Sequence, residues 1–302
     1  LHMAKKINQN NICLFFDRVK LTLRCGCVII DMTSSLPPRM GFEVIDRLGD
    51  GCFCKVFLAK SYWHLGHVAI KVSDCKKMPK YMIYKNFPRE LDIMHQVHHP
   101  HIVKAYETYK TRKGLVIAVM EPGKTRLEDF IDDEGALPLH KAKRWFTQLL
   151  SAVVYLHEKD IVHRDINCEN IILTSDLDQQ LKLMDFSFSR KSRGFPELCK
   201  APLVESCYNA PEVLRRQPYD AKKNDVWSLG ITLYAMITGD LDMYQDLEII
   251  QEFQRHPLYY PFHVDKSVRE FISYILQHDP FTRPSAPHLP PHLLPNPPLS
   301  AT

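Results

Sequence analysis

The spacing of apolar residues changes near Gly123, and this change limits the folds that the chain can adopt. Before Gly123, short runs rich in Val, Ile, Phe and Tyr are bounded by turn residues, which is typical of β-strands. After it, apolar residues recur at the spacing of one face of a helix. The sequence therefore predicts an α+β chain with a strand-rich lobe followed by a helical lobe.

The strand-rich lobe, predicted over residues 41–123 with a connecting hinge, also contains one helix. Residues 86–97 ("NFPRELDIMHQV") carry apolar side chains at helical spacing, and Pro88 either opens this helix or kinks it. The predicted strands are "FEVIDRL" (42–48), "KVFLA" (55–59), "HVAIKV" (67–72), "IVKAYETY" (102–109) and "LVIAVME" (115–121).

The helical lobe is predicted over residues 124–285. Residues 140–160 place Trp145, Phe146 and Leu149 on one apolar stripe, whereas residues 225–239 are apolar on most sides and predict a buried helix. Seven prolines between positions 284 and 298 prevent a further helix, so residues 286–302 are expected to form an extended tail. The PxxP spacings in this tail suggest an SH3-type partner.

Residues 1–40 stay outside this fold prediction. The chain begins with Leu1, and Met3, Met32 and Met40 are alternative starts of the natural chain. We expect an N-terminal extension that is either disordered or an artefact.

The composition excludes several classes of protein. The chain of 302 residues is 45% hydrophobic and 25% charged, as in ordinary globular proteins, and its net charge of +4 arises from scattered residues. Without a long basic run, nucleic acid is not an expected partner. Membrane binding is not expected either, because no apolar run approaches about 18 residues. Nine cysteines without paired CxxC units favour a reducing, cytoplasmic location.

The stretch "GDGCFCKV" lies at the turn between the first two predicted strands. Gly49 and Gly51 would let backbone amides approach a phosphate, although two glycines at a hairpin are more often only a hairpin. Lys71 follows in the third strand among apolar neighbours, where its ammonium group needs an anionic partner. Glu90, in the predicted helix, is the best candidate.

Two further stretches carry acidic and amide side chains in a fixed order. In "HRDINCEN", Asp165 is suited to accept a hydroxyl proton, and Asn170 offers an amide oxygen to a divalent cation. In "LKLMDFSFSR", a short strand precedes Asp185, a hard carboxylate ligand for Mg²⁺.

Three other residues are expected to be structural. Glu212, in "YNAPEVL", is predicted to be buried and to pair with Arg283 of "RPSA". Asp225, in "DVWSLG", is expected to accept hydrogen bonds from loop amides rather than to act in catalysis.

Taken in order, these stretches resemble the signature set of protein kinases over residues 42–285. "FPREL", "HHPHIV", "VHRDINCEN" and "GFPEL" are similar to the testis-specific serine/threonine kinases within the calcium/calmodulin-kinase-like group. The resemblance implies a bilobal kinase fold, ATP and Mg²⁺, or Mn²⁺ in its place, as cofactors, and a protein substrate.

The resemblance also implies a role for individual residues. Asp165, Lys71, Glu90 and Asn167 match catalytic positions, and Asn170 and Asp185 match the metal ligands. Glu169 matches a position that favours arginine in the substrate. The implied nucleotide site, between the lobes, comprises Gly49, Gly51, Val56, Ala69, Lys71, Met120, Glu121 and Gly123.

The chain departs from the family pattern at several positions. Asn167 replaces the lysine that neutralises the γ-phosphate. Glu205 replaces a serine or threonine, so that its carboxylate either repels the incoming phosphate or swings outward into solvent. Ser187 replaces the glycine of the Asp-Phe-Gly motif, and Lys200 and Ala201 occupy the place of the activating threonine.

Two functions are consistent with these residues. One is an ATP-dependent serine/threonine kinase with reduced activity, because the lysine, the glutamate, the base and both metal ligands are present. The alternative is a pseudokinase that binds nucleotide or acts as a scaffold, because Asn167 and Glu205 both act on the same site.

Overall fold

The computed structural model describes two compact units of the chain. Unit 1 comprises Leu1–Tyr84 and Ala105–Pro122, and unit 2 comprises Lys85–Lys104 and Gly123–Thr302. The described residues are 41–50, 53–64, 66–80, 82–111, 114–174, 179–201, 203, 206–241, 258–262 and 264–290.

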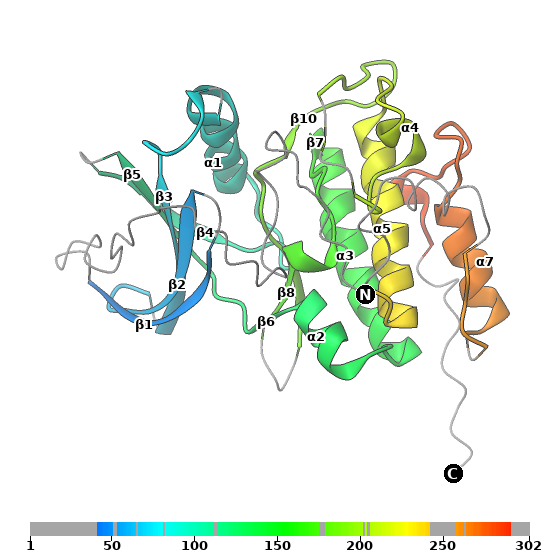
Figure 1. The fold of residues 1–302 in the computed structure, drawn as a ribbon, viewed down its shortest axis with the longest axis horizontal. Helices are drawn as coiled ribbons and strands as arrows, with labels where there is room; N and C mark the ends of the chain where they lie inside the picture. The colour runs from blue at the N-terminus through cyan, green and yellow to red at the C-terminus, as the bar shows by residue number, and fades with distance from the viewer. Residues whose placement is uncertain are drawn as a thin grey trace, which may run out of the picture. The chain divides into compact units, whose positions relative to one another are not determined.

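Unit 1 is built on a sheet of five strands in the order β1-β2-β3-β5-β4, with every neighbouring pair antiparallel (Figure 1). All five predicted strands are confirmed. Their bounds are β1 (Phe42–Asp50), β2 (Cys54–Ser61), β3 (Gly66–Asp74), β4 (Ala105–Lys110) and β5 (Leu115–Met120).

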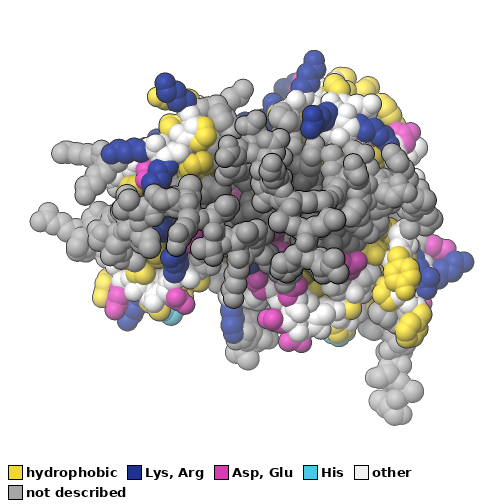
Figure 2. All heavy atoms as spheres, viewed as in Figure 1, with side chains coloured by type: hydrophobic (Ala, Val, Ile, Leu, Met, Phe, Trp, Pro, Cys, Tyr) yellow, Lys and Arg dark blue, Asp and Glu magenta, His cyan; other side chains and the backbone are white. Residues whose placement is uncertain are grey.

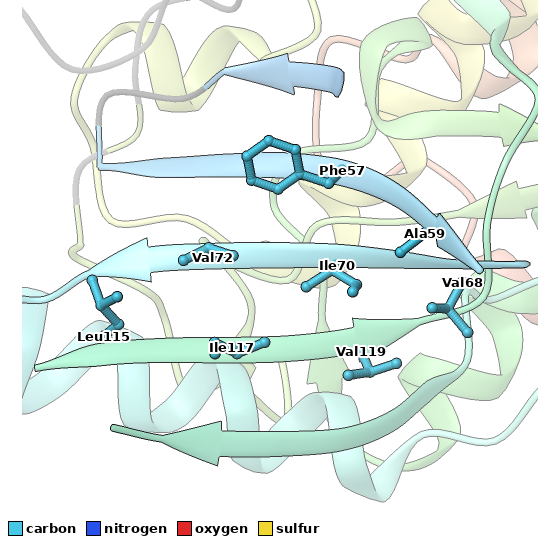
Figure 3. Packing of buried hydrophobic residues seen from close by; sticks show 8 residues of the cluster. All are labelled: Phe57, Ala59, Val68, Ile70, Val72, Leu115, Ile117 and Val119. Carbon is cyan, nitrogen blue, oxygen red and sulfur yellow. The ribbon is translucent and has the colours of Figure 1, made fainter. Parts of the chain in front are cut away.

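The core of unit 1 covers one face of this sheet. Val68, Ile70 and Val72 alternate along β3, so their side chains point to the same face. They pack with Phe57, Ala59, Leu115, Ile117 and Val119 of the neighbouring strands, as Figure 3 shows. Burial of these branched side chains, worth roughly 1.5–3 kcal/mol each, fixes the register, because a shift by one residue would turn them to the opposite face.

The described residues of unit 2 contain most of the helices together with one three-stranded and one two-stranded sheet. The π-helical turn η3 (Met82–Asn86) leads into α1 at the boundary of the two units. The helices of unit 2 are α1 (Phe87–Gln96), α2 (Leu127–Glu134), α3 (Leu139–Glu158), η4 (Cys168–Asn170), α4 (Pro211–Leu214), α5 (Ala221–Thr238), α7 (Lys266–Ile275) and η5 (Ala286–His288). The strands are β6 (Thr125–Arg126), β7 (Ile161–Val162), β8 (Ile171–Leu173), β9 (Leu181–Leu183) and β10 (Arg190–Lys191).

The position of Pro88 in α1 decides between the two roles considered for it. Pro88 lies in the first turn of the helix, where the missing amide hydrogen costs no intrahelical bond. It therefore opens the helix. Although α1 falls within the range 41–123 expected for the first lobe, it groups with unit 2, where it contacts β10.

Helices α3 and α5 form the centre of unit 2 and pack against each other (Figure 1). The predicted stripe of α3 is buried, including Trp145, Phe146 and Leu149. Helix α5 is buried on nearly all sides, as its sequence predicted. Asp220 caps its start, because its carboxylate accepts the amide hydrogens of Lys222 and Lys223, and Gly239, in the left-handed conformation with φ 73°, caps its end.

The folded part of unit 2 extends into the predicted tail. Residues 286–288 form η5, which contacts α3, and the side chains of Ala286 and Leu289 are buried. Residues 291–302 lie outside the described part of the chain.

In Figure 2, hydrophobic side chains are exposed near α7. Tyr259 and Phe262 are among the exposed aromatic residues. Within the described ranges, no helix combines the length and apolar character needed to cross a membrane.

Candidate active site

The register of unit 1 brings several predicted nucleotide-binding residues to one face of the sheet. Val56 pairs with both Gly49 and Lys71, and Ala69 pairs with Met120. Because directly opposite residues of an antiparallel pair share a face, these side chains lie on the face opposite to the core of unit 1.

Gly49 leaves open space above this part of the sheet. A Cβ atom built at Gly49 would meet nothing within 4 Å. The backbone is therefore accessible to a ligand at this turn, which fits the predicted phosphate contact. Gly51 lies outside the described residues.

In unit 2, an antiparallel strand pair brings the two predicted metal ligands to the same end of the sheet. Ile171, the first residue of β8, pairs with Leu183, the last residue of β9. Asn170 directly precedes β8 and Asp185 follows β9, and the amide of Met184 donates to the carbonyl of Asn170 at 2.9 Å. Residues that are distant in sequence are thereby held together by main-chain hydrogen bonds.

Two asparagine side chains hold the carboxylate of Asp165. Asn167 Nδ2 donates to Oδ1 at 3.0 Å, and Asn170 Nδ2 donates to Oδ2 at 2.7 Å. Asn170 also donates to the carbonyl oxygen of Asp165 at 2.9 Å. Each carboxylate oxygen thus has a donor, so the orientation of the predicted base is fixed.

Asn167 has a second role that its sequence position did not reveal. Its Oδ1 atom accepts the amide hydrogen of Asn170 at 2.9 Å and caps the short helix η4. Asn167 therefore supports both Asp165 and the loop that carries Asn170.

The pKa of Asp165 is raised to about 7. Desolvation is the main cause, followed by the negative charge of Asp185, and the hydrogen bonds from Asn170 and Asn167 oppose the shift. A divalent cation at Asp185 would cancel part of this repulsion. The donor set of a carboxylate and an amide oxygen also suits Mg²⁺.

A cation at this position would need further ligands. The described residues contain no group of three or more His, Cys, Asp or Glu side chains that could hold a metal ion. Mg²⁺ commonly combines one or two protein groups with water and substrate phosphates, so Asp185 and Asn170 fit a metal that is bound together with a nucleotide.

The backbone is held in an unusual conformation at two residues of the site. Arg164 and Asp185 have φ values of 69° and 59°, in the left-handed region that residues with a Cβ atom rarely adopt. Asp225 stabilises this backbone conformation at Arg164 by accepting the amide hydrogen of Arg164 at 2.7 Å. Asp225 also accepts from the amide of His163 and from the His157 ring, each at 2.9 Å, which confirms its predicted structural role.

Ser187 contacts the predicted metal ligand directly. Its amide donates to Asp185 Oδ1 at 3.1 Å, and its hydroxyl group donates to the same oxygen. The replacement of glycine therefore adds a hydrogen-bond donor to Asp185.

Carboxylates gather around Arg126 near the start of α2. Arg126 binds Asp129 through Nε and Nη2 at 2.8 and 2.7 Å, and Nη1 lies 3.5 Å from Glu128. The pKa of Glu169 is raised to about 7, mainly by burial and then by the charge of Glu128, while Arg126 opposes the shift. Arg126 thus contacts two carboxylates and acts electrostatically on a third, that of Glu169.

The predicted pair of Glu212 and Arg283 is confirmed. Arg283 donates through Nη1 and Nη2 to the two carboxylate oxygens of Glu212, at 2.7 and 3.0 Å. Both side chains are buried, so the paired charges hold the start of α4 to the segment that follows α7.

Other predictions stay untested. Lys71 belongs to unit 1, whereas the buried Glu90 belongs to unit 2, and their pairing remains a prediction. Glu205 lies outside the described residues, as does Gly51. Glu121 and Gly123 lie just before and just after the boundary of the two units, at Pro122.

The fold and the arrangement around Asp165 are those of a protein kinase, and comparison with known proteins agrees. Residues 42–294 match the family described as "Protein kinase domain". The chain therefore belongs to the protein kinase family.

Within this family, the chain is similar to testis-specific serine/threonine-protein kinases. It is 41% identical to mouse kinase 2 over 216 residues, which cover 70% of this chain and 60% of the relative. It is 38% identical to mouse kinase 1 over 251 residues, covering 80% and 68%, and 34% identical to human kinase 3 over 251 residues, covering 81% and 92%. The chain thus spans less than two thirds of one of these relatives and nearly all of another.

Several residues of the site were missed by sequence reasoning. Tyr219 contacts Arg164, and Arg126 lies among the carboxylates next to Glu169. An aromatic residue before a helix gives no signal of such a contact. The acidic run "LEDFIDDE" after Arg126, in contrast, could have suggested an ion pair at helical spacing.

Proposed function

We propose that this chain is an ATP-dependent protein kinase that transfers the γ-phosphate to a serine or threonine hydroxyl. The observation that carries the proposal is the arrangement of Asp165, which is oriented by Asn167 and Asn170 and lies near the negative charge of Asp185. A retained base with two fixed oxygens is suited to orient a hydroxyl group and accept its proton.

Each unit contributes different groups to the proposed reaction. In unit 1, Lys71 and the face formed with Val56 and Ala69 bind the nucleotide. In unit 2, Asp185 and Asn170 hold Mg²⁺, with Mn²⁺ as an alternative, which supplies charge neutralisation at the phosphates. Asp165 accepts the proton of the hydroxyl whose oxygen forms the new bond to phosphorus, and ADP leaves.

The test of catalysis compares the chain with Asp165→Asn. Transfer of labelled phosphate to a generic basic protein and to the chain itself is measured with Mg²⁺ or Mn²⁺. We expect transfer by the unaltered chain and a loss of at least about 10²-fold in the variant. Equal signals from both proteins would show that the phosphate transfer comes from a contaminant.

A pseudokinase is the second candidate, and the contacts of Asn167 favour it. Because one amide hydrogen of Asn167 is bound to Asp165 and its oxygen is bound to Asn170, this side chain is already engaged within the loop. It also carries no positive charge for the γ-phosphate. This function predicts nucleotide binding without transfer.

Nucleotide binding is tested by thermal shift with ATP and Mg²⁺, since a ligand stabilises the folded state by RT ln(1 + [L]/Kd). We expect stabilisation of the unaltered chain and none in Lys71→Met. Lys60→Met is the matched control, because Lys60 is an exposed lysine on the neighbouring strand β2. Stabilisation without transfer would support a pseudokinase that binds nucleotide, and the absence of both stabilisation and transfer would exclude the kinase and the nucleotide-binding pseudokinase.

The proposed substrate carries arginine upstream of the acceptor. The carboxylates of Glu128, Asp129 and Glu169 lie around Arg126, and a guanidinium from the substrate would favour the ionised form of Glu169, whose pKa is raised to about 7. Peptides with arginine or alanine at that position, assayed with the unaltered chain and with Glu169→Gln, test this preference. It should be reduced in the variant, and an unchanged preference would assign the selection to other residues. The proline-rich tail remains a proposed SH3 ligand on its PxxP spacing alone, testable by SH3-array binding of residues 286–302.

A further inference from the structure

Two phenylalanine side chains of unit 2 contact each other at the surface. Phe195 and Phe281 are 63% and 76% exposed, although phenylalanine is among the residues most often buried. Their ring centroids lie 5.7 Å apart with an interplanar angle of 78°, which is an edge-to-face arrangement. Leu198 is exposed as well. Unit 2 therefore presents a pair of apolar rings to solvent, from two segments that are distant in sequence.

Phe195 lies on a turn that is held to the start of α5. Its amide donates to Asp220 Oδ2 at 3.0 Å, and this carboxylate also caps α5. The Glu197 amide closes the turn by donating to the carbonyl oxygen of Gly194 at 2.8 Å. Gly194 has a φ of 81°, and a Cβ atom built there would lie 3.0 Å from the Asp220 carboxylate, so glycine permits this close approach. The backbone of Phe195 is thus fixed while its ring stays exposed.

Phe281 lies on a second turn, which is also held by backbone hydrogen bonds. Its amide donates to Asp279 Oδ1 at 2.9 Å, and the amides of Thr282 and Arg283 donate to the Asp279 carbonyl at 3.2 and 3.0 Å. Arg283 is buried and bound to Glu212, which anchors the end of the turn. Because both turns are already ordered, a partner that packs against the two rings loses little conformational entropy in ordering them.

The segments that carry or contact this pair expose more cations than anions. The pKa of His278 is lowered by desolvation and then by the charges of Arg215 and Arg283, which places Arg215 near the turn of Phe281. In Figure 2, hydrophobic side chains near α4 are bordered by Lys and Arg side chains. Within residues 190–201, 215–223 and 278–283, the exposed charged side chains are the cations Lys191, Arg193, Lys200, Arg215 and Arg216 and the anions Glu197 and Asp279.

We propose that Phe195 and Phe281, together with these cations, form a docking surface for a protein segment that carries a large apolar side chain next to Asp or Glu residues. The apolar side chain packs against the two rings, because this removes exposed aromatic surface from water. The carboxylates of the partner lie near cations such as Arg193 and Arg215, which select an acidic partner over a basic one.

Aromatic rings next to cations are also found where proteins bind single-stranded nucleic acid. Here the two rings contact each other edge to face, so that one ring covers part of a face on which a base would stack. Glu197 and Asp279 are exposed within the same segments and would repel a phosphate backbone. An acidic protein segment therefore fits this surface better than an oligonucleotide does.

The first experiment selects peptides of about 12 residues from a random phage-displayed library on the full chain. We expect the selected peptides to combine Asp or Glu with Leu, Ile, Phe or Trp. The Kd of a synthetic selected peptide, measured by fluorescence anisotropy, should be at least about tenfold higher for Phe195→Ser and for Phe281→Ser, as for an anchor residue of an interface. Tyr259→Ser is the matched control, because Tyr259 is a 79% exposed aromatic residue of unit 2 outside these segments, and its Kd should change less than about twofold.

The charge is tested separately by Arg193→Glu, with Arg193→Lys as the control that keeps the charge. Arg193→Glu should raise the Kd at least about fivefold, and Arg193→Lys should leave it within about twofold. Because Arg193 and both phenylalanines are exposed, thermal unfolding of these variants should match that of the unaltered chain. A selection without acidic peptides, a selection without binders, or a Kd unchanged in both Phe195→Ser and Phe281→Ser would overturn the proposal.

Other occupants of the surface give different results. Binding of fluorescein-labelled oligothymidylate that is lost in Phe281→Ser would assign the rings to nucleic acid and overturn the proposal. A dimer in sedimentation equilibrium that dissociates in Phe281→Ser would show that a second copy of the chain covers the rings, and it would also overturn the proposal. Peptide binding is measured without phosphate transfer, so a failure of the proposed kinase function leaves this test intact.

Discussion

Asn167 Nδ2 donates to Asp165 Oδ1 at 3.0 Å, so the residue that replaces the expected lysine supports the predicted base directly. The same side chain caps η4 through its oxygen. Substitution at this position therefore changes two properties at once, the charge available to phosphate and the stability of the loop.

Asn167→Lys separates these two properties. We expect kcat to rise, because the lysine supplies positive charge to the transferred phosphate, and we expect the free energy of unfolding to fall by about 1 kcal/mol, because the cap is lost. Steady-state kinetics and urea denaturation measure the two effects. Asn167→Ala, which loses the cap without gaining charge, is the control and should lose stability without gaining activity. An unchanged kcat in Asn167→Lys would mean that charge at this position is not limiting.

The pKa of Asp165, about 7, predicts that activity depends on pH near neutrality. The ionised form acts as the base, so kcat/KM should rise as pH increases from about 6 to 8. In Asp185→Asn the negative charge of Asp185 is removed, and the pKa of Asp165 should decrease. Carboxyl-carbon NMR titration of the folded chain measures this shift even if the variant is inactive. A pKa that stays the same would mean that burial alone causes the shift.

The same pKa predicts the sign of a stability change. In the unfolded chain Asp165 titrates near 4, whereas in the folded chain it stays protonated up to about pH 7. Between these values the folded state binds more protons, so the contribution of Asp165 to stability is lost as pH rises from about 4 to 7. Urea denaturation of the chain and of Asp165→Asn across this range isolates the contribution, and the difference between them should shrink or reverse as pH rises. A difference that is constant with pH would contradict the raised pKa.

The buried pair of Glu212 and Arg283 should be essential for stability. Arg283→Met leaves the carboxylate of Glu212 buried without its partner and should lower the free energy of unfolding by about 3–5 kcal/mol. The control is Lys266→Met, because Lys266 and Glu270 form an exposed pair at 3.6 Å whose loss should leave stability nearly unchanged. Chemical denaturation of both variants gives the comparison, and equal losses would argue against the importance of burial.

The hydroxyl group of Ser187 should compete with a cation for Asp185. It donates to the Oδ1 atom, so Ser187→Ala should free this oxygen while keeping the backbone donor. We expect Mg²⁺ in the presence of nucleotide to bind about twofold to fivefold more tightly in the variant, since one competing hydrogen bond is removed. Calorimetric titration measures the affinity. Weaker binding would instead show that the hydroxyl group orients the carboxylate for the metal.

Much of the fold could be predicted from the sequence because local patterns dictate it. The apolar run of β3 set the strand, and the apolar stripe of α3 set the helix and the side of it that is buried. The structural roles of Asp225 and of Glu212 with Arg283 were also predicted, since a buried charge requires a partner. The order of the motifs in the sequence thus predicted the family and named most of the candidate site residues.

Pairings in which at least one group is uncharged could not be predicted in the same way. Tyr219 and Arg164 are 55 positions apart, and nothing in the sequence indicates that a tyrosine hydroxyl will accept from this guanidinium. The double role of Asn167 likewise depends on the turn of η4, which brings Asn170 within hydrogen-bond distance. The sequence by itself determined the strands of unit 1, the helices α1, α3 and α5, the buried stripe of α3, and the order of the acid and amide residues, because these follow from periodicity and from the cost of burying charge. Only the tertiary structure decided which neutral donors and acceptors meet around Asp165, because hydrogen bonding depends on distance and direction in space.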